Sequence, residues 1–337
     1  MSNSISRWSA AWLLGTAALL ASPLPSAAAG PATMRAAVVS AGRLEIRSVP
    51  VPQPGAGQVR IAVRAASINP ADWKMARTAG RMGPDPVLGL DAAGTIDAVG
   101  PGVTGWKVGE AVIAVTPPPH GAYAQYALAS VHAMARKPRT LTFEEAAGIP
   151  VAGITAWHAL VDIARVRPRE RVLIDGGAGG VGSAAVQIAK ARGAYVIATA
   201  RASNARYLKS IGANEVIDYT AGPFEKDVKH IDVVIDTVSG RNAERALRTL
   251  KPGGWLVSLA GSVPASQCAA AKVHCSEPHG SGKQPADPIL DHVVALANAG
   301  RYRVSIERVL PLAHAAEAWR LSRDGRTRGK LILAVAR

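Results

Sequence analysis

The chemically most informative stretch of the chain is a glycine-rich turn between an apolar run and a helical pattern. Gly177, Gly179 and Gly182 follow the run that begins at Arg171, and Ser183 to Arg192 carries small and apolar residues at helical spacing. In such a strand–turn–helix the first glycine forms the tight turn, the second lets backbone N–H groups approach a pyrophosphate, and the third lets helix and strand pack closely. The amino terminus of the helix then faces the phosphates. The turn therefore predicts a dinucleotide-binding site.

The residues after the next apolar run indicate which dinucleotide binds. About 20 residues past the first glycine, an acidic side chain would bind the ribose 2′-hydroxyl of NAD. Here the stretch 198–206 has no acid and instead carries Arg201, Ser203 and Arg206. Guanidinium groups and hydroxyls suit a 2′-phosphate, so we expect NADP(H). The alternative is that both arginines are exposed, on a loop and on the first turn of a helix, and contact no ligand.

The elements that must position this turn recur at intervals of about 20 residues with helical stretches between them. Their apolar runs are Ala194 to Thr199, Glu215 to Asp218, Asp232 to Asp236 and Trp255 to Leu259. This alternation predicts an α/β fold with a doubly wound parallel sheet. Because ligands bind outside the carboxyl ends of parallel strands, Thr237 and Gly261 are predicted to edge the cofactor site.

Length and composition agree with an ordinary globular protein of about two domains. The chain has 337 residues, of which 48% are hydrophobic and 19% charged, and domains average about 150 residues. The net charge is +15, but the basic residues form no long run and the aromatic residues, 4% of the total, are not interleaved with them. We therefore expect a solvated basic surface and no nucleic-acid partner.

Residues 1–29 have the pattern of a secretory signal peptide. Arg7 is the only charge, Ala10 to Ala21 is apolar, and Ala27 to Ala29 precede Gly30. The apolar run is shorter than the roughly 20 residues of a membrane span, so no permanent anchor is expected. Export is the first interpretation. The alternative is a cytoplasmic protein whose translation starts at Met34, where the first strand of a domain already begins.

The cysteine content limits metal chemistry. Cys268 and Cys275 are the only cysteines, so a structural zinc site with four thiolates is excluded. One disulfide or one mixed-ligand site remains possible, and the sequence does not decide whether the two cysteines pair.

Motifs along nearly the whole chain from Met34 onward resemble the medium-chain dehydrogenase/reductase family, in particular its zinc-independent, quinone oxidoreductase-like branch. The resemblance rests on the order and spacing of the segments SINPADWK (67–74), LGLDAAG (88–94), VGPGV (99–103), GAYAQY (121–126), AAGIP (146–150), GITAW (153–157), the glycine turn, DTV (236–238), KPGG (251–254) and GKLIL (329–333).

The resemblance implies a β-rich, GroES-like catalytic domain and an inserted Rossmann domain. The catalytic domain would comprise residues 34–152 and be completed by 301–337, and the Rossmann domain would comprise 153–300. Short alternating segments such as Gln58 to Ala65 agree with this division. By the same resemblance, Ala271 to Cys275 would form a strand near the dimer edge of the Rossmann sheet, and the protein would be a homodimer.

The positions that hold catalytic zinc in other branches of the family carry different residues here. Zinc-dependent relatives have a cysteine shortly before an aspartate and a His-Glu pair after a glycine. This chain has Asn69 before Asp72, and Leu90-Asp91 after Gly89. We therefore expect no metal at the active site.

Without zinc, the negative charge that develops on an acceptor's carbonyl oxygen during hydride transfer must be stabilised by hydrogen-bond donors or a cation. The resemblance places Asn69, Lys74 and Tyr123 at the cleft as candidate catalytic groups. It also places Thr155 near the nicotinamide, Lys330 near the cleft, and Gly179, Gly180 and Val181 at the pyrophosphate. Each catalytic candidate also has a purely structural interpretation: Asn69 as a turn residue, Lys74 as a partner of Asp72, and Tyr123 as a strand residue.

The predicted function is NADPH-dependent reduction of quinones or α,β-unsaturated carbonyls. The alternative is an NADP(H)-binding protein with little turnover that acts as a cofactor-responsive binding partner. A zinc alcohol dehydrogenase is a third possibility that metal analysis would exclude. No local motif specifies the acceptor pocket, so the sequence does not name the substrate.

Overall fold

The computed structural model describes residues 31–238, 240–276 and 287–335. The predicted targeting segment, residues 1–29, lies outside these ranges. No helix within them is long and apolar enough to cross a bilayer.

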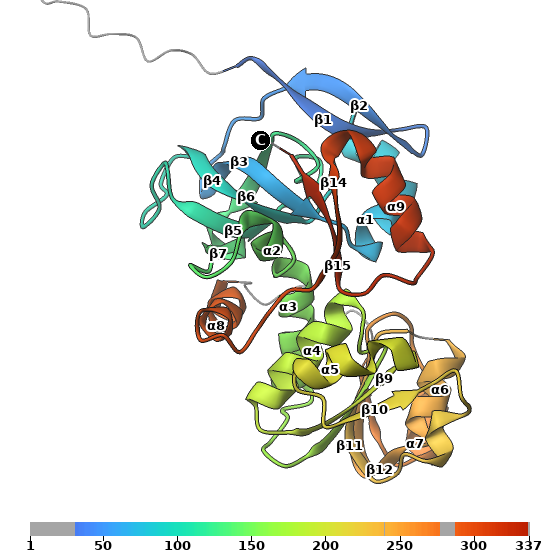
Figure 1. Cartoon of the computed structure of the whole chain (residues 1–337). Coiled ribbons are helices and arrows are strands. Elements are labelled where there is room, and N and C mark those ends of the chain that lie inside the picture. The colour runs from blue at the N-terminus through green and yellow to red at the C-terminus, as the bar shows by residue number, and fades with distance from the viewer. Residues whose placement is uncertain (1–30, 239, 277–286, 336–337) are drawn as a thin grey trace, which may run out of the picture. The chain divides into compact units, whose positions relative to one another are not determined.

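A six-stranded parallel sheet carries the glycine turn (Figure 1). Its strands, in spatial order, are β10 (Glu215–Asp218), β9 (Tyr195–Ala200), β8 (Arg171–Asp175), β11 (Ile231–Asp236), β12 (Leu250–Ser258) and β13 (His274–Ser276). Numbered along the chain this is the order 3-2-1-4-5-6 of a Rossmann fold, in which the cofactor crevice lies where the order reverses, between β8 and β11. The predicted doubly wound α/β fold is confirmed.

The strands of this sheet carry apolar side chains on both faces. Helices therefore cover both faces of the sheet. Val172 and Ile174 of β8 pack in one core cluster with helix α4, whereas Leu173 packs in another with helix α6. The helical elements of this part of the chain are α3 (Pro150–Trp157), the π-helical η3 (His158–Ile163), α4 (Gly180–Ala191), η4 (Ala202–Asn204), α5 (Ala205–Ser210), η5 (Phe224–Lys226), α6 (Arg241–Leu247), α7 (Ala265–Ala270) and α8 (Asp287–Asn298).

A seven-stranded, mostly antiparallel sheet gives the second part of the fold its GroES-like, β-rich character. Its order is β14 (Ile306–Pro311), β15 (Lys330–Ala334), β3 (Gln58–Ser67), β4 (Asp91–Val99), β5 (Ala111–Val115) and β7 (Met134–Arg136), with β6 (Tyr126–Ser130) paired to β3. The hairpin β1 (Thr33–Ser40) and β2 (Arg43–Pro50) stands beside it as a separate sheet. The strands nearest the carboxyl end thus join strands from the amino-terminal half.

Short helices connect these strands. They are α1 (Pro70–Met75), η1 (Ala76–Met82), η2 (Val131–Ala133), α2 (Phe143–Ala147), η6 (Leu312–His314) and α9 (Ala315–Arg323). Helix α1 begins directly after β3 because Asn69 takes an extended conformation at its amino terminus and Pro70 occupies its first turn.

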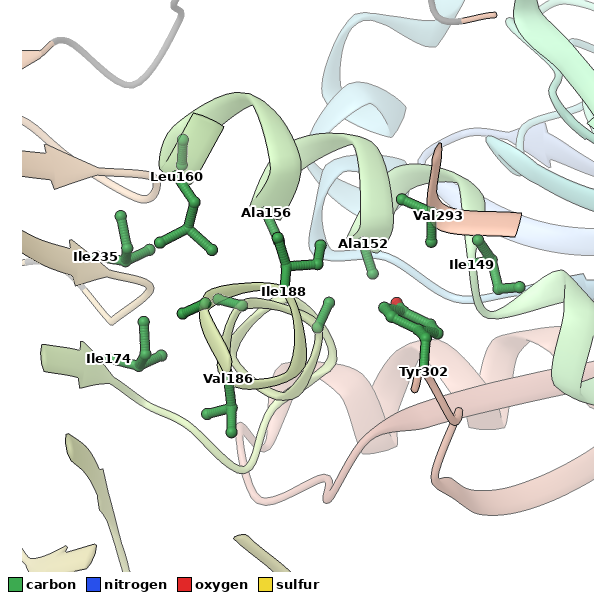
Figure 2. Close-up of a cluster of buried hydrophobic side chains, with 14 of the residues drawn as sticks. Ile149, Ala152, Ala156, Leu160, Ile174, Val186, Ile188, Ile235, Val293 and Tyr302 are labelled. Atoms are coloured by element: carbon green, nitrogen blue, oxygen red, sulfur yellow. The ribbon is translucent and has the colours of Figure 1, made fainter. Parts of the chain in front are cut away.

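The largest core cluster joins α3, α4 and α8 to the parallel sheet (Figure 2). Ala152 and Ala156 of α3 leave room for Ile188 of α4, because a methyl group lets two helices approach closely. Tyr302 and Val293 close the other side of the cluster. Since α3 follows the antiparallel sheet and α4 follows the glycine turn, this packing connects the two sheets.

Two predicted elements differ from the structure at their boundaries. The strand predicted at Trp255 to Leu259 begins at Leu250, because Leu250 already pairs with Ile231 of β11. The KPGG segment between Leu250 and Trp255 lies in a register shift of this pairing. The strand predicted at Ala271 to Cys275 begins only at His274. Ala271 instead caps helix α7, and Lys272 has φ +55°, a left-handed conformation that does not continue a strand.

The two cysteines form a disulfide between Cys268 of α7 and Cys275 of β13, with Cα atoms 6.2 Å apart. The bond ties the edge strand of the parallel sheet to the helix that precedes it. It closes a loop with a sequence separation of 7.

Removal of this disulfide should destabilise the protein. A cross-link that closes a loop of about eight residues lowers the conformational entropy of the unfolded chain. This stabilises the folded protein by about 2.5 kcal/mol. We expect Cys268→Ala/Cys275→Ala to lower the melting temperature by several degrees in calorimetry, and a reducing agent to lower that of the unchanged protein equally. A reducing agent that leaves the unchanged protein's melting temperature where it was would show that the pair is not formed in solution.

Candidate functional site

The glycine turn has the geometry of a phosphate-binding loop. Gly176 has φ +77°, and a Cβ on Gly177 would lie 2.8 Å from the Cβ of Ala198. A Cβ on Gly182 would collide with the carbonyl oxygen of Gly176. The nearest atom to a Cβ on Gly179 would be that same carbonyl, at an ordinary 3.5 Å. Packing within the protein thus explains why positions 177 and 182 need glycine. It does not explain Gly179, which is the glycine expected to face a pyrophosphate.

Helix α4 begins directly after this turn, with Gly179 at its N-cap and Gly180 and Val181 in its first turn. The unpaired N–H groups of a helix amino terminus favour an anion there. The residues present therefore fit the phosphates of a dinucleotide.

The carboxyl-terminal segment is bonded to the same turn. The N–H of Gly329 donates to the carbonyl of Ala178 at 2.8 Å, and Gly329 pairs with Gly179 in an isolated parallel bridge. The side chain of Lys330 then passes Gly180 so closely that a Cβ there would lie 2.8 Å from Lys330 Cδ. Gly180 is therefore the glycine that makes room for Lys330.

Lys330 ends in a buried polar network. Its Nζ donates to Asn69 Oδ1 at 2.6 Å and lies 3.4 Å from Asp91 Oδ2. Asn69 Nδ2 donates to that same Asp91 oxygen at 2.8 Å. Lys330, Asn69 and Asp91 are 5%, 3% and 0% exposed, so the ammonium and the carboxylate neutralise each other out of water.

Asp91 is fixed by two further donors. Ser67 Oγ donates to Asp91 Oδ2 at 2.5 Å, and the backbone N–H of Val151, in the first turn of α3, donates to Oδ1 at 2.8 Å. These four interactions satisfy a carboxylate that would otherwise be costly to bury. They also fix the start of α3 relative to β3 and β4.

The orientation of the Asn69 amide follows from its two neighbours. A lysine ammonium only donates and an ionised aspartate only accepts, so the amide oxygen must face Lys330 and the nitrogen must face Asp91. Of the two N–H bonds on Nδ2, Asp91 accepts one. Among the described residues, no acceptor of the second N–H is found.

A second buried carboxyl, Asp72, lies beside this network. It accepts the backbone N–H of Asn69 at 2.7 Å, the N–H of Leu90 at 3.1 Å and the hydroxyl of Tyr123 at 2.7 Å. Burial raises the pKa of Asp72 to about 7, although the bonds from Tyr123 and Asn69 oppose the rise. Asp72 thus fixes the backbone that presents the Asn69 side chain.

The three predicted catalytic residues have different positions. Asn69 lies in the network. Tyr123 is fully buried, and its hydroxyl donates to Asp72 Oδ2 at 2.7 Å. Lys74 is exposed, with its Nζ 5.7 Å from the centre of the Trp73 ring, and is not part of the network. Residues two apart on a helix point about 200° away from each other, so a buried Asp72 turns Lys74 outward.

Two of the predicted cofactor residues beyond the turn, Thr237 and Gly261, follow the carboxyl ends of parallel strands. Thr237, after β11, donates from Oγ1 to the carbonyl of Asp175 at 2.8 Å. Gly261 is half-buried after β12, and Thr155 is half-buried on α3, one turn beyond Val151. No contact recorded for Thr155 or Gly261 ties either to the buried network.

The stretch predicted to bind a 2′-phosphate lies at the end of β9. Arg201 and Ser203 are exposed around η4, and Arg206 is exposed on the first turn of α5. Arg201 Nε lies 3.3 Å from the hydroxyl of Tyr219, which follows the neighbouring strand β10. Tyr219 is a candidate contact that the sequence did not reveal, because it approaches Arg201 only through strand pairing.

A carboxylate also lies near Arg201. Hydrogen bonds from Thr220 lower the pKa of Asp218, and Arg201 contributes to the same lowering. The arginine is therefore partly balanced by Asp218.

The structure also bears on metal binding. Among the described residues, no group of three or more His, Cys, Asp or Glu side chains is arranged to hold a metal ion.

Two segments of the chain match known protein families. Residues 55–139 match the family described as the alcohol dehydrogenase GroES-like domain, and residues 211–333 match the family described as zinc-binding dehydrogenase. The mitochondrial NAD(P)H oxidoreductase RTN4IP1 of Danio rerio is 32% identical over 82% of this chain and 84% of its own length. The chloroplast envelope quinone oxidoreductase homolog of Arabidopsis thaliana is 32% identical over 87% of this chain and 94% of its own.

Several solved structures of oxidoreductases and related proteins are similar to this chain. The quinone oxidoreductase from Coxiella burnetii has a TM-score of 0.80 and 30% identity, covering 90% of this chain and 98% of its own. A mycobacterial protein solved in complex with NADPH has a TM-score of 0.81 and 27% identity over 90% of this chain and all of its own. The CurK enoyl reductase has a TM-score of 0.80 and 25% identity over 91% of this chain and all of its own.

Gly179→Val tests the phosphate-binding assignment of the turn. Because no protein atom lies closer than 3.5 Å to the new Cβ, the melting temperature should hardly change. The Kd for NADPH and for NADH, measured by fluorescence titration, should both rise at least about tenfold, since the side chain blocks approach of the pyrophosphate. Gly182→Ala is the contrasting variant, because its Cβ meets Gly176 and should destabilise the fold. Unchanged affinity in Gly179→Val would show that the turn binds no pyrophosphate.

Asp72 should make stability depend on pH. Its pKa is raised to about 7 in the folded protein, above the roughly 3.9 of an unfolded aspartate. Its contribution to stability is therefore complete below about pH 4 and is lost as the pH rises through about 7. Between about pH 5 and pH 8, the free energy of unfolding should fall by about 2–3 kcal/mol relative to Asp72→Asn. Urea unfolding at both pH values measures this, with exposed Asp324→Asn as the control. A constant difference between the unchanged protein and Asp72→Asn would contradict it.

Proposed function

The chain belongs to the medium-chain dehydrogenase/reductase family and is an oxidoreductase with a nicotinamide cofactor, and we propose that it uses NADPH to reduce quinones or α,β-unsaturated carbonyls without bound zinc. The observation that carries the proposal is the Lys330–Asn69–Asp91 network, which presents an oriented amide donor next to the glycine turn. The relatives named as quinone oxidoreductases and the enoyl reductase neighbour support the same reaction class.

The hydride for this reaction would come from the reduced nicotinamide ring. In the acceptor, negative charge then develops on a carbonyl oxygen, and the free N–H of Asn69 is the donor available to it. Lys330 holds the amide oxygen and adds a positive field, while Asp91 holds the amide nitrogen and prevents the amide from flipping. An oriented donor costs no reorganisation during the reaction, and one such donor is typically worth about 10²–10³ in rate.

The residues at the zinc positions of the family support a zinc-independent reaction. Asn69 and Leu90 are not thiolate or imidazole ligands. Asp91, the remaining carboxylate, is already engaged by Lys330, Asn69, Ser67 and a backbone N–H. In this proposal Asn69 and Lys330 take over the role of a metal in stabilising the developing charge.

Preference for NADPH rests on the end of β9. Arg201, Ser203 and Arg206 provide cations and a hydroxyl there, and Tyr219 holds the Arg201 guanidinium at 3.3 Å. The neighbour solved with NADPH supports the same cofactor.

The experiment that tests the proposed function is steady-state oxidation of NADPH and of NADH by protein starting at Gly30, with quinones, enones and enals as acceptors. Turnover with NADPH and any of these acceptors is the expected result. Tight NADPH binding with no turnover on any acceptor would instead favour the alternative of a cofactor-responsive binding protein. Metal analysis of the same active sample is expected to find no stoichiometric zinc.

Arg201→Glu should separate the two cofactors. It replaces an ion pair with the 2′-phosphate by repulsion, and a hydrogen bond to a charged group is worth about 1.5–3 kcal/mol. The Kd for NADPH should therefore rise about 10- to 150-fold, while that for NADH changes less than about twofold. Lys209→Glu, the same charge change on the exposed face of α5, is the control. Equal losses for both cofactors in Arg201→Glu would refute the assignment.

A further inference from the structure

Four polar side chains form a buried row across the carboxyl ends of the central strands of the parallel sheet, and we call them the polar row. They are Thr199 of β9, Asp175 of β8, Asp236 of β11 and Ser258 of β12, and none is more than 1% exposed. Asp175 and Asp236 are partners in the register of β8 and β11, and Asp236 and Ser258 in that of β11 and β12. Partners on neighbouring parallel strands point to the same face of the sheet at about 5 Å, so two carboxyl groups lie side by side out of water.

The polar row is bonded directly to the glycine turn. Thr199 Oγ1 accepts the N–H of Gly176 at 3.0 Å and donates to Asp175 Oδ1. The backbone carbonyl of Asp175 accepts the hydroxyl of Thr237 at 2.8 Å. Asp175 thus precedes the turn in the chain and is held to it by the Thr199 hydroxyl, so a charge on its carboxyl lies close to the start of the turn.

The two carboxyl groups differ in their hydrogen-bond partners. Asp236 accepts the N–H of Val238 on Oδ1 at 3.0 Å and the hydroxyl of Ser258 on Oδ2 at 2.7 Å. Asp175 accepts Thr199 on Oδ1, but its buried Oδ2 has no hydrogen-bond donor among the described residues. A buried ionised oxygen without a donor is costly, whereas a protonated oxygen can itself donate. Asp175 Oδ2 is therefore the atom at which a proton relieves the pair.

Neighbouring charges favour the same proton. Burial raises the pKa of the Asp175 carboxyl above its usual range, and the negative charge of Asp236 raises it further. Hydrogen bonding by Thr199 and the positive charge of Arg245 oppose the rise in this pKa. Arg245, on α6, is already paired with Glu225 of η5 through its Nε at 2.8 Å. Two adjacent carboxylates in a buried site are not both ionised readily, so one proton held between them is favoured.

We propose that Asp175 and Asp236 share one proton beneath the glycine turn and that loss of this proton to solvent weakens binding of the dinucleotide, so that cofactor affinity falls as the pH rises. The inference rests on the proposed function for the assignment of the turn to the pyrophosphate, and it adds a pH-sensitive control of that site. Asp175 acts on the cofactor through the turn and contacts neither substrate nor reacting atoms, so it is a positioning residue.

The direction of the effect follows from charge. The pyrophosphate is an anion that backbone N–H groups and the positive end of helix α4 would hold. An additional negative charge at the start of the turn repels this anion, and the repulsion is strong where little water screens it. By linkage, binding of the anion raises the pKa of the pair. Each bound dinucleotide therefore takes up part of a proton wherever the free pair has begun to ionise.

Binding of ADP-ribose at different pH values tests the proposal. This probe carries the pyrophosphate but lacks the nicotinamide ring and the 2′-phosphate, which itself titrates near about pH 6. We expect its Kd, measured by calorimetric titration of the unchanged protein, to rise at least about fivefold between about pH 5 and about pH 8. In Asp175→Asn the Kd should stay within about twofold of the low-pH value throughout, because the amide keeps the shape of the carboxyl group and carries no charge.

Asp72→Asn is the matched control, because it removes another buried carboxyl whose pKa is raised by burial. Its Kd for ADP-ribose should rise with pH as in the unchanged protein. An equal rise in Asp175→Asn, or no rise in the unchanged protein, would overturn the proposal. If ADP-ribose binds at no pH, the assignment of the turn to the cofactor fails and the proposal fails with it.

Proton uptake provides a measurement that needs no variant. The heat of ADP-ribose binding, measured at one pH in two buffers of different ionisation enthalpy, gives the number of protons taken up by the complex. Between about pH 5 and about pH 7 we expect uptake of a fraction of one proton by the unchanged protein and none by Asp175→Asn. Equal heats in the two buffers at every pH, or release of protons, would show that the pair does not control binding.

Discussion

The site depends on one buried ammonium group. This group belongs to Lys330, whose side chain passes Gly180 of the glycine turn. Its Nζ lies between Asn69 and Asp91. Removing one partner of a buried pair typically costs about 3–5 kcal/mol, so each of the three residues constrains the other two. Because they come from β15, the β3–α1 junction and β4, this interaction fixes the Asn69 amide and the glycine turn relative to each other.

The glycines of the turn are required for different reasons, and the passage of the Lys330 side chain is one of them. Gly177 and Gly182 are required by contacts within the turn, Gly180 by the passage of Lys330, and Gly179 by no protein contact. The motif in the sequence already gives Gly177, Gly179 and Gly182 different roles, and contacts within the protein account for Gly177 and Gly182 but not for Gly179. Asp72 adds a second support, since it accepts the backbone N–H of Asn69 and is itself held by Tyr123.

The sequence predicted most of the fold and only part of the site. The glycine turn and the apolar strands are local patterns, so the parallel sheet was predicted with small errors at strand ends. Asp91 was noted only as an absent zinc ligand, because its partners Lys330 and Ser67 lie far from it in sequence. An aspartate that begins an apolar strand must be buried and therefore needs partners, and this signal would have revealed it. Lys74 was predicted in the site because spacing alone does not show which face of a short helix is buried.

In the proposed reaction Asn69, oriented by Lys330 and Asp91, stabilises the charge that develops on the acceptor during hydride transfer. The most direct test is the single-turnover rate of NADPH oxidation in stopped flow, for the unchanged protein and for Asn69→Ala, with the best acceptor found. The rate for Asn69→Ala is expected to be about 10²–10³ lower, with an unchanged Kd for NADPH. Ser67→Ala, which removes a different donor to Asp91, should slow the reaction far less. An unchanged rate in Asn69→Ala would show that Asn69 does not stabilise the charge on the acceptor.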